Sequence, residues 1–334
     1  MITPLIDLLC VGLLSIVAIG AALLFGVDNL KTDSLGYLIP VATLINGAHF
    51  MASYRLLYQS REQIMRYKSA SIYVPALLLL YSVYALNRLV EVPDETYWFQ
   101  GLLVAASLYL ALHYTGQTWG MMSSFAYIEK AFFDQLEKRI FIYSLRLLVV
   151  WQVVWSVYLI QDLPGWLSDI RPILDPSTDT LAVLALFAGS YAFYRMKKRL
   201  GKAPPLRVLV PFYTLFAWYA LLAIHPAALL GVQISHAVQY LVFPVRVELN
   251  RQQRALGDDH VHQRHLLAYC LALTFLSLVF FLFLPEMLKD GFSVYSQALI
   301  ASINIHHFYT DGCIWKISSP VVRDDLFSHL SRGQ

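Results

Sequence analysis

Apolar residues occur in long runs along this chain, and short polar segments separate them. A helix needs about 20 mostly apolar residues to cross a hydrocarbon core of about 30 Å. Ten runs approach or exceed this length, and we expect each to form a transmembrane helix. The ten segments cover roughly residues 5–27, 35–57, 69–87, 97–125, 140–161, 179–195, 206–224, 226–246, 266–285 and 292–316.

The charged residues between these segments are sorted by sign. Loops that follow even-numbered segments are rich in lysine and arginine, and the alternate loops are rich in aspartate and glutamate. Because basic loops stay on the cytoplasmic side, this alternation predicts ten spans with both termini in the cytoplasm. As examples, Lys197, Lys198, Arg199 and Lys202 follow the sixth segment, and Asp162, Asp169, Asp175 and Asp179 follow the fifth.

Composition agrees with this pattern. Of the 334 residues, 58% are hydrophobic and 14% are charged, whereas soluble domains have about 45–50% and about 25%. These values argue against a water-soluble enzyme, and they exclude a disordered chain, a collagen and a coiled coil. We therefore expect an all-α, polytopic membrane helix bundle that forms one transmembrane domain over residues 1–334, in the cytoplasmic membrane of a bacterium.

Two further classes receive no support from the sequence. The net charge of +3 is small and gives no indication of nucleic acid as a partner. A phosphate-binding glycine loop, a nucleophile elbow and a paired-cysteine motif are missing from the sequence. The first apolar run lacks a basic leader and a cleavage site, so we interpret it as a retained span.

Histidines inside the predicted spans carry the strongest functional signal. His49, His113, His236 and the pair His306–His307 lie in four spans that run from outside to inside. Three spans place a histidine 16, 18 and 17 residues after an outer acidic residue. At about 1.5 Å per residue, these three lie within roughly 3 Å of one another in depth. The fourth, 10 residues after Pro226, joins them if the turn there is recessed.

Polar neighbours recur around these histidines at positions −3 and +4, which share a helix face. His306 points about 100° away from His307, so we expect one of the two to be a ligand. We choose His307, because Asn304 and Asp311 lie on its helix face. The residues expected to support the imidazoles by hydrogen bonds are Asn46, Ser53, Gln117, Gln233, Tyr240, Asn304 and His306. An aromatic residue also directly follows three of the histidines.

Ionisable groups in hydrocarbon are costly, and those that occur usually face the bundle interior and have a function there. We therefore predict a transition-metal site, with iron first and zinc or copper as alternatives. The predicted ligands are His49, His113, His236 and His307, and Asp311 serves as a further ligand or as a proton acceptor. The expected activity is oxidative, an oxygenation or desaturation of a hydrophobic substrate from the bilayer, supported by an electron donor.

Other interpretations of the same residues stay open. A single membrane histidine is often only a hydrogen-bond partner between helices. Four histidines also suit a haem protein for electron transfer or quinol chemistry, or a transporter or proton pathway lined by histidine and aspartate. The loop residues His260, His262 and His265 form either a metal site or a solvated linker.

The general layout resembles that of the Brp/Blh-type carotene-cleaving dioxygenases, which are polytopic, of similar length, and bind iron through histidines on separate helices. The resemblance implies a membrane helix bundle with non-haem iron chemistry. It covers the general plan, and no residue role is carried over from it.

A Gly116-x-x-x-Gly120 motif follows His113, and we expect it to let this span approach a neighbouring helix closely.

Overall fold

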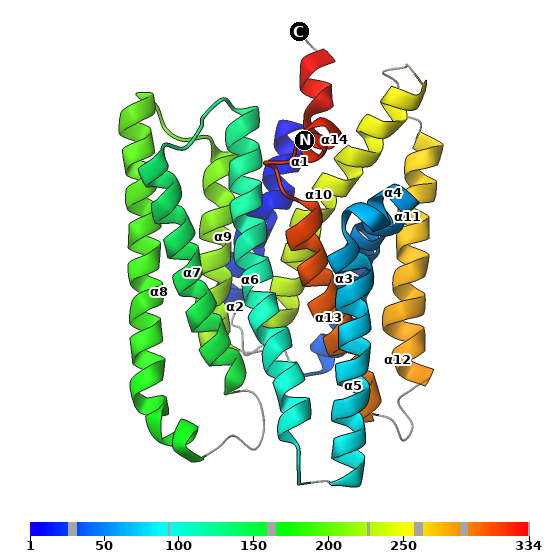
Figure 1. Ribbon diagram of the computed structural model, residues 1–334. Helices are drawn as coiled ribbons and strands as arrows, with labels where there is room; N and C mark the ends of the chain where they lie inside the picture. The colour runs from blue at the N-terminus through cyan, green and yellow to red at the C-terminus, as the bar shows by residue number, and fades with distance from the viewer. Residues whose placement is uncertain are drawn as a thin grey trace. The chain divides into compact units, whose positions relative to one another are not determined.

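The computed structural model describes residues 1–25, 32–92, 94–158, 165–225, 228–256, 263–287 and 293–332. Every regular element in these residues is a helix, so the prediction of an all-helical fold is confirmed. Each of the ten predicted segments contains helix (Figure 1). The helices are α1 (Pro4–Leu8), η1 (Leu9–Leu13), α2 (Leu14–Phe25), α3 (Thr32–Tyr58), α4 (Arg61–Arg66), η3 (Ser69–Tyr73), α5 (Val74–Glu91), α6 (Tyr97–Ile128), α7 (Gln135–Val157), α8 (Gly165–Leu200), α9 (Leu206–Ile224), α10 (Leu229–Leu256), α11 (Gln263–Leu278), η5 (Val279–Phe283), α12 (Leu284–Met287), α13 (Ser293–Ile314) and α14 (Pro320–Arg332).

Five of the described helical stretches are long and apolar enough to cross a membrane. The helices that carry the predicted histidines, α3, α6, α10 and α13, are not among them. Each of those helices contains amide, hydroxyl and imidazole groups, which lower its mean hydropathy. The number of spans and the side on which the termini lie stay predictions. The five stretches are Pro4–Ala21, Ser69–Glu91, Gln135–Val157, Leu206–Ile224 and Gln263–Phe283.

The chain forms two compact units. Unit 1 contains Met1–Ser71, Ala217–Ser293 and Cys313–Gln334, and unit 2 contains Ile72–Phe216 and Val294–Gly312. In unit 1, α3 packs against α10 and α11, and α10 also contacts η1 and α14. In unit 2, α7 contacts both α6 and α8, and α5 contacts α6 (Figure 1). That the whole chain is a single transmembrane domain stays a prediction.

A local break in the first helix of unit 1 is supported by α10. Gly12, inside η1, has a φ of 145°, a backbone conformation that residues with a side chain rarely adopt. The carbonyl of the preceding residue, Val11, accepts a hydrogen bond of 3.0 Å from the Gln239 amide. Because a carbonyl released by a helix break must find another donor in an apolar bundle, this contact stabilises the break.

Close approaches between helices occur at glycines other than the ones predicted. A Cβ atom at Gly47 of α3 would lie 2.1 Å from Ser277 Oγ on α11, and one at Gly189 of α8 would lie 2.0 Å from the Phe212 ring. A Cβ at Gly116 or Gly120 would meet no atom within 4 Å. The expectation that these two glycines mark a close helix contact is therefore wrong, because spacing alone does not show which helix face meets a neighbour.

The end of unit 2 where α7 begins is held by charged groups. Asp134 caps α7 and accepts a 2.7 Å hydrogen bond from the Glu137 amide. The Glu137 carboxylate is fully buried and lies 2.7 Å from the Arg199 guanidinium on α8. A buried carboxylate needs such a partner, so this pair joins the ends of α7 and α8.

Candidate metal centre

Two helices of unit 2, α6 and α13, supply a buried group of ionisable side chains. Small residues on α13, among them Ala298 and Ala301, share a buried core cluster with Leu102 of α6. Such small side chains allow two helices to approach closely. About three turns further along, α6 carries His113, and about two and three turns after Ala301, α13 carries the predicted residues His307 and Asp311.

The ligand atoms of these three residues converge. His113 Nδ1 lies 3.8 Å and His307 Nε2 lies 3.5 Å from the same carboxylate oxygen, Asp311 Oδ2. All three potential ligand atoms lie within 4.8 Å of one another, and all three side chains are buried. His307 and Asp311 are four residues apart on one helix, so their side chains lie on the same helix face.

The two nitrogen–oxygen distances in this group are longer than hydrogen bonds and close to the distance between two ligands of one metal ion. Both nitrogen–oxygen distances exceed the 2.7–3.2 Å that is usual for a hydrogen bond. Metals of the first transition row bind imidazole nitrogen at about 2.1 Å, so two ligand atoms of one ion lie roughly 3 to 3.5 Å apart. The buried histidine–aspartate group could therefore hold a metal ion.

Phe308 contacts both imidazoles of this group. Its ring stacks on His113 at a centroid distance of 4.6 Å and an interplanar angle of 27°, and it meets His307 edge-on at 5.4 Å. The two imidazoles lie 5.1 Å apart and are nearly perpendicular. The sequence did not predict that Phe308 contacts both imidazoles. The signal that could have indicated it is the position of Phe308, directly after His307.

The other two predicted ligands, His49 and His236, form a second pair in unit 1. Their rings are 4.9 Å apart in an edge-on arrangement, and His49 is fully buried. Asn46 Oδ1 lies 3.3 Å from His49 Nδ1, and the Tyr240 ring lies 4.2 Å from the His49 ring. An amide and a phenol are thus among the neighbours of His49.

The remaining predicted residues take varied positions. Ser53 is buried, and its Oγ lies 2.5 Å from Tyr240 Oη. His306 is buried beside His307 on α13. Gln117, Gln233 and Asn304 are half-buried on α6, α10 and α13.

The loop histidines of the sequence separate into two groups. His260 and His262 lie outside the described residues. His265 Nε2 lies 2.9 Å from Glu248 Oε1, and Arg55 contacts the same oxygen at 3.2 Å. His265 is thus part of an ion-pair network on α3, α10 and α11, in which Arg55 supplies a cation to the carboxylate.

Trp315, directly after the observed end of α13, contacts Tyr240, which lies beside His49 of unit 1. The Trp315 indole donates a 2.7 Å hydrogen bond to Tyr240 Oη. No sequence signal indicates this contact, because a tryptophan near a membrane boundary is most simply an interface residue.

The chain matches no protein-family model, no curated protein and no solved structure, so its function has to be inferred from these residues.

Proposed function

We propose that this protein is a membrane-embedded metalloenzyme whose metal is iron, bound by His113, His307 and Asp311. Its reaction is an oxidation of a hydrophobic substrate that arrives from the bilayer, with electrons from a separate donor. The observation that carries this proposal is the convergence of two imidazole nitrogens and one carboxylate oxygen within 4.8 Å at a buried position.

The chemistry of the donor set supports iron. Two histidines and one carboxylate on one face of a metal, with the other positions open, are typical of non-haem iron oxygenases. A structural zinc site would be closed by four protein ligands and would favour cysteine. When bound, iron would supply the redox chemistry that dioxygen activation requires.

The protein residues have three tasks in this proposal. His113 and His307 hold the metal through neutral imidazoles, and Asp311 adds the negative charge that offsets part of the metal charge. Phe308 restricts the ring of His113 by stacking on it. The apolar helices exclude water, which strengthens electrostatic interactions within the site. The sequence also assigns His49 and His236 to this metal, and that assignment stays a prediction.

Elemental analysis and an optical spectrum of detergent-purified protein test the proposal. We expect about one equivalent of iron per chain in the wild type, and its loss in His113→Gln, His307→Gln and Asp311→Asn. His265→Gln is the control, because it removes an imidazole that pairs with Glu248 and is expected to keep the metal. Less than about a tenth of an equivalent of any transition metal in the wild type would refute the proposal.

The same samples separate the other functions. A Soret band would identify a haem protein, and metal-independent, proton-coupled flux in liposomes would identify a transporter. A carboxylate oxygen within 3.5 Å and 3.8 Å of the two imidazoles favours a single ion over a macrocycle between those rings. His49→Gln and His236→Gln test the two predicted ligands of unit 1 by the same measurement.

Access of small molecules to the metal tests the oxidative part of the proposal. Nitric oxide binds at open positions of ferrous iron and gives a characteristic electron paramagnetic resonance signal. We expect this signal in anaerobic, iron-loaded wild type and its absence in Asp311→Asn. Iron that binds without a nitrosyl signal would contradict an oxygen-activating role and leave a structural one.

A further inference from the structure

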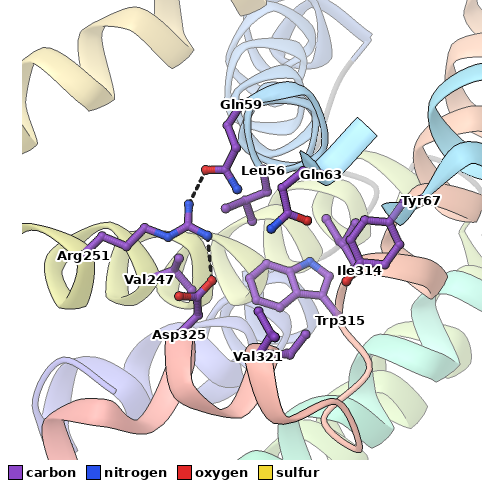
Figure 2. A pocket seen from close by; sticks show the side chains of 11 residues that line it. Leu56, Gln59, Gln63, Tyr67, Val247, Arg251, Ile314, Trp315, Val321 and Asp325 are labelled. Carbon is purple, nitrogen blue, oxygen red and sulfur yellow. Dashed lines mark hydrogen bonds and ion pairs between the residues drawn. The ribbon is translucent and has the colours of Figure 1, made fainter. Parts of the chain in front are cut away.

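A chain of contacts joins the buried His49 ring to a pocket at the surface of unit 1. The pocket has a volume of about 30 Å³, which is room for about two water molecules. Figure 2 shows Trp315 in its wall, between Gln63 and Val321. The indole therefore has one side toward the pocket, while its N–H is used inside the protein.

Tyr240 is the next member of the chain. It is buried, and its oxygen accepts the 2.7 Å hydrogen bond from Trp315 Nε1. Because an indole can only donate, the O–H of Tyr240 can donate to Ser53 Oγ, 2.5 Å away. Two partners on different elements thus fix the direction of the phenol, one on α3 and one after α13.

The ring of Tyr240 lies against His49. The two rings are 4.2 Å apart at an interplanar angle of 56°, which is direct contact. On the other side of the imidazole, Nδ1 faces Asn46 Oδ1 at 3.3 Å. A proton on Nδ1 suits this amide oxygen and would favour one neutral tautomer of His49.

The position of Trp315 is itself fixed by polar contacts around the pocket. Arg251 of α10 bonds both to Gln59 and to Asp325 of α14, as the dashed lines in Figure 2 show. Asp325 is 2.6 Å from the Arg251 guanidinium. These contacts tie α14 to α10, and the segment between α13 and α14 that carries Trp315 is held at that end.

We propose that Trp315 and Tyr240 are positioning residues for His49. Trp315 directs the phenol of Tyr240, and Tyr240 holds the His49 ring in one orientation, which a metal ligand requires. The inference rests on the proposed function and on the predicted role of His49 as a ligand. Partners that orient a histidine ligand commonly change metal affinity by about 10- to 100-fold when they are lost.

The variants Trp315→Phe and Tyr240→Phe test this proposal, because each keeps an aromatic ring and removes the hydrogen bond between the two residues. Trp218→Phe is the matched control, since the buried indole nitrogen of Trp218, also in unit 1, makes no hydrogen bond within the described residues. Two readouts are needed, one with a metal and one without.

The first readout is the dissociation constant for cobalt(II), followed by its visible absorption. We expect it to rise about 10-fold in Trp315→Phe and Tyr240→Phe, and to change less than about twofold in Trp218→Phe. The second readout is the nitrogen NMR spectrum of labelled histidines in metal-free protein, with His49 assigned from the signal lost in His49→Gln. We expect one neutral tautomer in the wild type and a mixture in the two variants.

The two readouts separate the positioning role from the metal function. Variants that melt at a lower temperature but keep the wild-type His49 signals and cobalt affinity would overturn the positioning role. Weaker cobalt binding with unchanged His49 signals would overturn it as well, because the two residues would then act on the metal by another route. If the wild type binds no cobalt and the variants still change the His49 tautomer, the proposed metal function fails and the positioning of His49 stands.

Discussion

Replacing Gly47 by alanine tests the contact between α3 and α11 at a position two residues before His49. The added Cβ would lie 2.1 Å from Ser277 Oγ, 3.0 Å from Ser277 Cβ and 2.8 Å from a ring carbon of Phe281. Carbon atoms in contact prefer about 3.5–4.0 Å. The alanine therefore cannot be placed unless both neighbours move.

The free-energy cost follows from these contacts. Overpacking of this kind costs about 1–3 kcal/mol. Rotation of Ser277 away from the new methyl group would break its 2.9 Å hydrogen bond to the Leu44 carbonyl, at a cost of about 1 kcal/mol. The better helix propensity of alanine offsets about 0.5–1 kcal/mol. We expect Gly47→Ala to lower the free energy of unfolding by roughly 1–3 kcal/mol.

Unfolding in detergent micelles, followed by circular dichroism, measures this change. Gly20→Ala is the control, because a Cβ there would meet no atom within 4 Å, and a gain of up to about 1 kcal/mol is expected. Ser277→Gly combined with Gly47→Ala removes the worst clash. The double variant should therefore lose less free energy of unfolding than the sum of the losses in the two single variants. Wild-type stability of Gly47→Ala would show that α3 and α11 are not this close.

Three further predictions concern charged groups outside the apolar spans, all measured by unfolding in detergent. Arg199→Met leaves the buried Glu137 carboxylate without its cation and should cost up to about 3 kcal/mol, most of which Glu137→Gln should restore; no restoration would contradict the pairing. Asp134→Ala removes the cap of α7 and should cost about 1 kcal/mol. The Glu137 amide lowers the pKa of Asp134, so this contribution is present above pH 3.8 and is lost as the pH falls below it, and a cap effect that persists in acid would refute the assignment. Burial lowers the pKa of His329 to about 4 from 6.5, so the unfolded chain takes up the proton first and stability should fall as the pH drops from 6.5 towards 4. His329→Asn should flatten that fall, and an unchanged pH profile would show that another group causes it.

Hydrophobic runs located the helices well where the helix and the apolar segment coincide. The predicted segment 206–224 is α9, Leu206–Ile224. Elsewhere the helix continues past the apolar run: α8 begins at Gly165, 14 residues before the predicted start at 179. Hydropathy indicates which part of a chain prefers hydrocarbon. A helix can continue into polar residues, because its backbone N–H and C=O groups bond to each other whatever the side chains are. The sequence therefore could not predict these ends.

For the candidate site, the sequence predicted the residues within one helix better than the partners between helices. His307 and Asp311 share a face because four residues make about one turn, and the structure places them 3.5 Å apart. Which helix brings the next imidazole depends on packing. Small side chains of α13 and Leu102 of α6 share one core cluster, and the neighbour of His307 in unit 2 is accordingly His113.

The buried charge beside the histidine pair of unit 2 supports the proposed metal site. The pair in unit 2 faces Asp311, a carboxylate that is 6% exposed. A buried carboxylate is costly unless a cation or a proton compensates it. A divalent metal would compensate the carboxylate charge and bind both imidazoles at the same time, so the carboxylate supports the proposed metal site.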